Sequence, residues 1–247
     1  MPLTIVVPVY ISSDLHLDFT RQTLESIKTS HDHEVLVVVN HCEPQYKDAL
    51  NSLLTTSSSL LPNPKGNILA SAWNLGLDHM VKSKSDYALV INNDIVFHPK
   101  CIDNLIVFAQ AHPEFLLWSA SEWSNQRTLA SAKLTQSFSL HPHFSCFMVS
   151  PKTIQEVGLF DEHFTMGYFE DNDYHTRILQ KGFQAAATDS AKFYHYGSRT
   201  INVDDDLKIE GKYHYQKNRE YFKQKWGVDI HGQAFDPPEE ILKAIKR

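Results

Sequence analysis

Three groups of polar residues carry the side chains that could do chemistry in this 247-residue chain. The first group is Asn92, Asn93 and Asp94, which follow an apolar run at residues 87–91. In open α/β sheets ligands lie beyond the carboxyl ends of such strands, and a carboxylate there can bind a divalent cation together with diphosphate oxygens. Asn and Asp also favour turns. The triplet therefore predicts either a cation and phosphate site or a polar turn.

The second group holds three carboxylates within four residues, Glu170, Asp171 and Asp173. Their mutual repulsion costs free energy unless a cation, a helix N-terminus or a substrate proton compensates it. Asp171 or Asn172 can cap a helix that runs to Gln180, and a capping carboxylate stays ionised, as a base that takes a hydroxyl proton must. The group therefore indicates either a general base or an acidic helix cap without chemistry.

The third group, His195 to Arg199, follows a short apolar segment near the end of the chain. A neutral imidazole at His195 could complete a metal site, and Arg199 could bind phosphate oxygens. A structural role is the alternative for His195, because the chain has 14 histidines and the others show no zinc-like spacing.

Composition and charge restrict the partners that this chain can have. The net charge is −6 without a run of Lys and Arg, so we expect neither nucleic acid nor an anionic membrane surface as a partner. The three cysteines are far apart and lack metal-binding spacing, which is typical of a reduced intracellular protein. The apolar start reads as a buried strand, and no apolar stretch approaches membrane-spanning length. These features predict a cytoplasmic protein without a transmembrane segment.

The apolar pattern of the first half of the chain predicts strands that alternate with helices. Buried strands are expected at residues 4–10, 34–39 and 87–91, and residues 55–66 are expected to form a loop. This alternation indicates an α/β fold with a mostly parallel central sheet and helices on both faces. The helices are expected at residues 19–27, 44–54 and 68–81, and from Pro99 onwards.

The pattern becomes irregular after about residue 114. No linker is long enough to divide the chain, so residues 1–247 are expected to form one domain. It would contain a nucleotide-binding half (about 1–113), a smaller acceptor-side half (about 114–226) and a C-terminal tail (227–247). In the acceptor-side half, strands are expected at 115–123, 138–149, 183–187 and 192–196, and helices at 172–180 and 207–226.

Taken in order, these residues resemble family-2 glycosyltransferases, which have the GT-A fold, and in particular the rhamnosyltransferase-like members. The resemblance extends from about Thr4 to Trp226. Each motif is weak alone, whereas five in the right order and spacing are specific. The motifs are residues 5–10, 72–77, 92–94, 157–162 with 170–177, and 217–222.

The resemblance implies an inverting transfer of a sugar from a nucleoside-diphosphate sugar to an acceptor hydroxyl on a glycan. It makes Asp171 the general base and places Asp94 at the metal motif, where it would hold Mn²⁺ or Mg²⁺, with His195 as a further ligand. Glu170 and Asp173 would bind acceptor or sugar hydroxyls, or brace the loop that carries them. The transferred group would be a hexosyl or deoxyhexosyl residue.

Two donor-side positions depart from the family pattern. The family usually has Asp after the second strand, where it contacts the base, but this chain has Asn40. The Asn40 amide can pair with the edge of uracil or thymine, so a UDP- or dTDP-sugar is expected. The first position of the metal motif is Asn92 where the family has Asp. The expected donor-binding residues are Pro8, Val9, Tyr10, Asn40, Asn74, Asn92, Asn93 and Arg199.

Three other functions are considered. A catalytically inactive module that binds nucleotide sugars or carbohydrates is the main alternative, although the presence of both Asp94 and Asp171 argues against it. A nucleotidyltransferase is disfavoured because no Gly-rich loop follows the first strand. A retaining transferase is the third alternative, and the anomer of the product would distinguish it.

Overall fold

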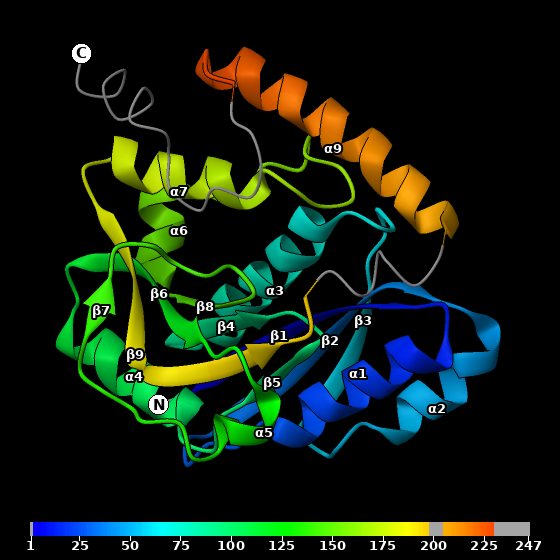
Figure 1. Ribbon diagram of the computed structural model, residues 1–247, viewed down its shortest axis with the longest axis horizontal. Helices are drawn as coiled ribbons and strands as arrows, with labels where there is room; N and C mark the ends of the chain where they lie inside the picture. The colour runs from blue at the N-terminus through cyan, green and yellow to red at the C-terminus, as the bar shows by residue number, and fades with distance from the viewer. Residues whose placement is uncertain (1, 198–204, 230–247) are drawn as a thin grey trace.

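The computed structural model describes residues 2–197 and 205–229 and confirms an α/β fold (Figure 1). Within these residues, nine strands form one mixed sheet in the order β3-β2-β1-β4-β8-β6-β9-β5, and β7 pairs with β9 outside this path. The strands are β1 (Leu3–Ile11), β2 (His33–Cys42), β3 (Ser58–Pro62), β4 (Tyr87–Ile91), β5 (Ile95–Phe97), β6 (Phe115–Glu122), β7 (Phe138–Ser139), β8 (Cys146–Val149) and β9 (Gln184–His195).

Helices cover both faces of the sheet, as expected. Figure 1 shows α3, α6, α7 and α9 on one side and α1, α2 and α4 on the other. The described helices are α1 (Asp14–Ser26), the 3₁₀ helix η1 (Pro44–Tyr46), α2 (Lys47–Ser52), α3 (Leu69–Ser83), α4 (Cys101–Ala111), α5 (Gln126–Leu129), α6 (Pro151–Val157), α7 (Glu170–Gln180) and α9 (Asp205–Trp226).

The parallel part of the sheet is built from β1 to β4. β1 pairs in parallel with β2 and β4, and β2 pairs in parallel with β3. Because side chains alternate along a strand, Ile5 and Val7 pack on the α4 side while Val6 packs against Trp73 and Leu77 of α3. The continuous apolar run of β1 is therefore buried on both faces. Its parallel pairing with β4 places the carboxyl ends of the two strands at the same edge of the sheet.

The second half of the chain, from about residue 114, adds antiparallel strands. β8 is antiparallel to both β4 and β6, and β9 is parallel to β6 but antiparallel to β5. Residues 138–149, expected to be one strand, form the separate strands β7 and β8. The two strands expected at 183–187 and 192–196 are one strand, β9, because a register shift against β6 between Ala120 and Ser121 absorbs the polar residues between them.

The expected loop at residues 55–66 contains a strand. β3 pairs with β2 at the end of the sheet, and its side chains are half-buried or exposed. A polar sequence is compatible with this place because an edge strand has one solvent-facing side. Among the described residues, no helix has the length and apolar character needed to cross a membrane.

Candidate active site

A pocket of about 390 Å³ lies at the carboxyl ends of β1, β2 and β4. This is the place where open α/β sheets bind ligands. The structure brings ten of the predicted site residues together in its lining: Pro8, Val9, Tyr10, Asn40, Asn92, Asn93, Asp94, Glu170, Asp171 and His195.

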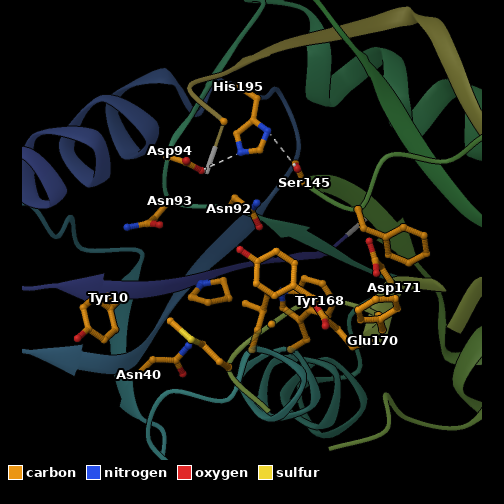
Figure 2. A pocket seen from close by; sticks show the side chains of 18 of the residues that line it. Tyr10, Asn40, Asn92, Asn93, Asp94, Ser145, Tyr168, Glu170, Asp171 and His195 are labelled. Atoms are coloured by element: carbon orange, nitrogen blue, oxygen red, sulfur yellow. Dashed lines mark hydrogen bonds and ion pairs between the residues drawn. The ribbon is translucent and has the colours of Figure 1, made fainter. Parts of the chain in front are cut away.

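The predicted residues occupy three parts of this pocket. In Figure 2, Tyr10 and Asn40 lie at one side, Asp94 and His195 lie at a second, and the carboxylates of the α7 N-terminus lie at the side away from Asn40. A ligand that reached all three parts would therefore have an extended shape, as a nucleotide joined to a further group has.

Asp94 and His195 form a direct pair in the second part. Nε2 of His195 is 3.1 Å from Oδ1 of Asp94, and its Nδ1 is 3.3 Å from the hydroxyl of Ser145 (Figure 2). Burial lowers the pKa of His195, but the hydrogen bond and negative charge of Asp94 more than offset this effect, so the pKa is raised. β9 places the histidine by pairing with β5, where His195 lies opposite Ile95, the residue after Asp94.

Asp94 and His195 could supply part of the coordination of a cation whose other ligands come from a bound substrate. Within the described residues, no group of three or more His, Cys, Asp or Glu side chains could hold a metal ion by itself. Mg²⁺ and similar ions are commonly held by one or two protein ligands together with phosphate oxygens and water. One carboxylate and one imidazole therefore suit an ion that arrives with a diphosphate. Ser145 can accept the Nδ1 proton of His195, which would leave Nε2 as the ligand atom.

Glu170 and Asp171 open α7, which corrects the expected helix cap. The N-cap is Phe169, with φ 72°, so Asp171 lies in the first turn and does not cap the helix. The backbone N–H of Asn172 donates to Oδ1 of Asp171 at 2.8 Å. Burial raises the pKa of Asp171 despite its hydrogen bonds to backbone N–H groups.

Glu170 is the more buried of the two carboxylates. Its side chain belongs to a residue that is only 4% exposed, and Oε2 has no hydrogen-bond partner among the described residues. Burial, followed by the negative charge of Asp171, raises the pKa of Glu170 to about 8. Glu170 therefore carries a proton at neutral pH, while the neighbouring carboxylate is the better candidate for the ionised group.

The loop before α7 has an unusual backbone. Met166, Tyr168 and Phe169 all have positive φ, between 65° and 77°. Such conformations cost free energy in residues other than glycine and persist only when surrounding contacts fix them. Asn218 of α9 supplies these contacts, because its Nδ2 donates to the carbonyls of Thr165, Gly167 and Tyr168 at 2.8–3.1 Å.

Two predicted site residues lie outside the pocket lining. The amide of Asn74 donates to the Phe160 carbonyl and to Glu162, and accepts from the Phe160 N–H, so it fastens α3 to the segment before α7. Asp173 accepts hydrogen bonds from Arg177 and Trp226 and pairs with Lys225, so it fastens α7 to α9. Arg199 lies outside the described residues.

Three lining residues at the ends of the strands, Tyr10, Asn40 and Asn93, have partners within the fold. The ring of Tyr10 stacks on His41 with a centroid distance of 4.8 Å. Asn63 Nδ2 donates to Oδ1 of Asn40 at 2.7 Å, which fixes the orientation of that amide. Asn93 is held by a hydrogen bond to Thr20 of α1. Asn63 was not predicted, because within a polar loop its sequence gives no sign of a buried contact.

The pocket contains further residues that the sequence did not indicate. Most of them are distant in sequence from the predicted residues that line the pocket, so their positions depend on the folded chain. Tyr168, Phe169 and Asn172 are the exceptions, since they adjoin the carboxylates in sequence. The additional polar and aromatic lining residues are Asn67, Trp73, Glu122, His143, Phe144, Ser145, Tyr168, Phe169, Asn172 and Tyr215.

Comparison of the sequence with known proteins identifies a family. The model of the family described as glycosyl transferase family 2 matches residues 4–174. A galactofuranosyl glycosyltransferase of Leishmania donovani is 24% identical over 214 residues, which cover 67% of this chain and 48% of that protein. The chain thus spans about half the length of this curated relative.

Solved structures of glycosyltransferases share the fold. The mannosyltransferase PcManGT from Pyrobaculum calidifontis, in complex with GDP-Man and Mn²⁺, matches 98% of this chain and 69% of its own with a TM-score of 0.66 and 15% identity. GalNAc-T7, with UDP, GalNAc and Mn²⁺, matches 99% of this chain and 53% of its own with a TM-score of 0.61 and 12% identity. At such low identity these matches bear on the fold alone, and they confirm the GT-A expectation.

Proposed function

The chain belongs to glycosyl transferase family 2, and from this premise we propose that it is a metal-dependent, inverting glycosyltransferase. It moves a hexosyl or deoxyhexosyl group from a nucleoside-diphosphate sugar to an acceptor hydroxyl. The observation that carries this proposal is that one pocket holds the Asp94–His195 pair and Asp171 in separate parts. The sugar would lie between them, with its leaving group near the pair and its acceptor near Asp171.

Asp171 is the general base of the proposed reaction. It takes the proton of the acceptor hydroxyl as the new bond from that oxygen to the anomeric carbon forms. The bond from this carbon to the diphosphate breaks at the same time, and its electron pair leaves on the nucleoside diphosphate. The backbone N–H of Asn172 holds the Asp171 carboxylate in place, and the first turn of α7 favours its negative charge.

Asp94 and His195 are the proposed metal ligands. A bound Mn²⁺ or Mg²⁺ supplies positive charge that stabilises the departing diphosphate. Support comes from the one-carboxylate, one-imidazole donor set and from the Mn²⁺ that accompanies nucleotide or nucleotide-sugar ligands in the mannosyltransferase and GalNAc-T7 structures. Both ions accept oxygen-rich ligation with one imidazole, so the donor set does not favour either.

The base of the donor is proposed to lie by Tyr10 and Asn40. Because Asn63 already donates to Oδ1 of Asn40, the Nδ2 group is the part of this amide best placed to bind a carbonyl oxygen of uracil or thymine. Uracil and thymine both carry such a carbonyl oxygen. The proposed donors are therefore UDP- or dTDP-sugars, with weaker discrimination between bases than a carboxylate would give.

Nucleoside-diphosphate release tests the proposal. The full chain is incubated with UDP-, dTDP- and GDP-sugars in the presence of Mn²⁺ and a mixture of glycosides, and both release and labelled product are measured. Transfer with inverted anomeric configuration, established by NMR, is the expected result. Binding of a nucleotide sugar without turnover would instead indicate a catalytically inactive module, and retention of configuration would contradict the single displacement.

A further inference from the structure

We propose that Tyr168, Tyr215 and Glu170 form the acceptor subsite and that the acceptor is a carbohydrate, bound through a ring face and a hydroxyl. This inference rests on the proposed function, because it assigns the second substrate of the same pocket. It predicts that a carbohydrate acceptor is preferred over a lipid alcohol or a peptide hydroxyl.

Two tyrosines from distant parts of the chain form an aromatic wall in the pocket. Tyr168 comes from the loop before α7 and Tyr215 from α9, and both line the pocket. Their ring centroids are 5.4 Å apart at an interplanar angle of 78°, and Tyr215 also contacts Phe169 at 5.1 Å. Aromatic faces with a phenolic group suit a ligand that has both apolar and polar edges. A sugar ring, with C–H groups on its face and hydroxyls on its rim, is such a ligand.

The wall lies at the carboxylate side of the pocket. Tyr168 precedes Glu170 by two residues, and Figure 2 shows it with Glu170 and Asp171, away from Tyr10 and Asn40. The proposed base Asp171 requires the acceptor hydroxyl to approach on this side. The tyrosines are therefore placed for the acceptor, since the nucleotide base would occupy the opposite side.

Glu170 adds a carboxyl oxygen that has no hydrogen-bond partner among the described residues. Its Oε2 is buried in the pocket lining and has no hydrogen bond within the described part of the chain. The ionisable groups that act on it are Asp171 and Asp173, both acidic, and the phenol of Tyr168 lies nearby. An unsatisfied buried oxygen is costly, and a ligand hydroxyl would remove that cost. A carbohydrate has several hydroxyls, so one can bind Glu170 while another approaches Asp171, whereas a simple lipid alcohol has only one.

The wall is fixed before a ligand arrives. Asn218 of α9 donates to the carbonyl of Tyr168 at 3.1 Å and to those of Thr165 and Gly167. Because Asn218 and Tyr215 belong to the same helix, one helix both supplies one ring and holds the backbone that carries the other. A preorganised wall loses little freedom when it binds a ring.

Substitutions on α9 test the subsite. Tyr215→Ala removes the ring, Tyr215→Phe keeps the ring without the hydroxyl, and Tyr213→Ala is the matched control because Tyr213 is 65% exposed two residues away. Initial rates are measured with methyl glycosides of several hexoses and pentoses, with octanol, and with a Ser/Thr peptide. We expect transfer to at least one glycoside, and a KM for that glycoside that rises about ten-fold in Tyr215→Ala but little in Tyr215→Phe or Tyr213→Ala.

Binding without donor separates this inference from the proposed function. Saturation-transfer NMR with the same glycosides should detect a bound sugar in wild type and in Tyr213→Ala but not in Tyr215→Ala. Transfer to octanol or peptide in preference to every glycoside would overturn the inference while upholding the transferase. An unchanged glycoside KM and undiminished sugar binding in Tyr215→Ala would overturn it as well. Sugar binding that depends on Tyr215 in a chain that consumes no nucleotide sugar would uphold the subsite and reject the transferase.

Discussion

The side-chain amide of Asn218 donates to the backbone carbonyl of Tyr168 at 3.1 Å, across 50 residues of sequence. Asn218 is fully buried, and its Oδ1 accepts from the backbone N–H of Thr165, so it binds the last part of the loop before α7, from Thr165 to Tyr168. This loop contains the positive-φ residues and leads directly into Glu170 and Asp171. The position of the proposed base therefore depends on a residue in α9.

Asn218→Ala should lower kcat more than it lowers donor affinity. The substitution leaves the loop carbonyls and the Thr165 N–H without their partner, which costs roughly 1–3 kcal/mol for each unsatisfied buried group. We expect at least a ten-fold loss of kcat, measured well below the unfolding temperature, because small displacements of a catalytic group are expensive. Tyr221→Phe is the control, since it removes a different α9 hydrogen bond, to Asp161. A variant with full kcat and reduced stability would show that Asn218 has a purely structural role.

Removal of the metal or of Asp94 should abolish transfer. Excess EDTA should stop the reaction, and Mn²⁺ should restore it. Asp94→Ala should lose the additional thermal stabilisation that Mn²⁺ and a nucleoside diphosphate give together to wild type. Asp18→Ala, which removes a carboxylate that pairs with Arg21 outside the pocket lining, should behave as wild type. Undiminished activity in EDTA would exclude the proposed role of the Asp94–His195 pair.

Glu170→Gln should change how stability depends on pH. The pKa of Glu170 is about 8 in the fold, against an ordinary value of 4.5, so between these values the folded state holds a proton that the unfolded state has lost. Stability from this group is complete at low pH and is lost as pH rises through about 8. Glutamine cannot ionise. The variant should therefore unfold a few degrees above wild type at pH 9, but not at pH 5.

Glu220→Gln, at an exposed position of α9, is the control for this pH series. It should leave the difference in unfolding temperature between pH 5 and pH 9 as it is in wild type. A parallel pH dependence in wild type and Glu170→Gln would mean that Glu170 is ionised throughout, and would contradict the assignment of the proton.

Gly76→Ala should destabilise the fold. A Cβ atom at this helical position would lie 2.3 Å from Cγ1 of Val6, a fully buried residue of β1, so α3 or β1 must move. Overpacking of this kind costs about 1–3 kcal/mol, which for a chain of this size lowers the unfolding temperature by roughly 2–4 °C per kcal/mol. Gly167→Ala is the control, because a Cβ there meets no atom closer than 3.8 Å. Equal unfolding temperatures for Gly76→Ala and wild type would show that α3 does not pack as described.

Strands that are buried on both faces could be predicted from the sequence, because burial dictates their composition. β1 and β4 are continuous apolar runs because both of their faces are covered, and the polar triplet after β4 marks the ligand side of the sheet. The sequence was insufficient for β3, where Ser58 and Ser59 form an edge strand with a composition typical of a loop. The apolar content of a segment indicates how deeply it is buried. An edge strand is held mainly by backbone hydrogen bonds, so its composition does not distinguish it from a loop.

The remaining differences concern polar residues whose partners are distant in sequence. Asn74 was expected at the donor, but the fold pairs it with the segment before α7. Of the two roles expected for Asp173, its contacts with α9 favour the bracing one. Asn63 and Asn218 were not among the predicted site residues, yet they hold the loops around the pocket. In the sequence, an amide or carboxylate that binds a ligand looks the same as one that holds two segments of the chain together. Only the partners that the fold supplies distinguish these two roles.

The most direct test of the central claim is the kcat of Asp171→Asn with saturating donor, Mn²⁺ and acceptor. Asparagine keeps the shape of the side chain but cannot accept the hydroxyl proton, so kcat should fall roughly 10²- to 10⁴-fold with little change in donor affinity. Glu170→Gln and Asp173→Asn are measured beside it. Near-normal turnover in Asp171→Asn, together with its loss in one of the other two variants, would contradict the account and assign the base to that other carboxylate.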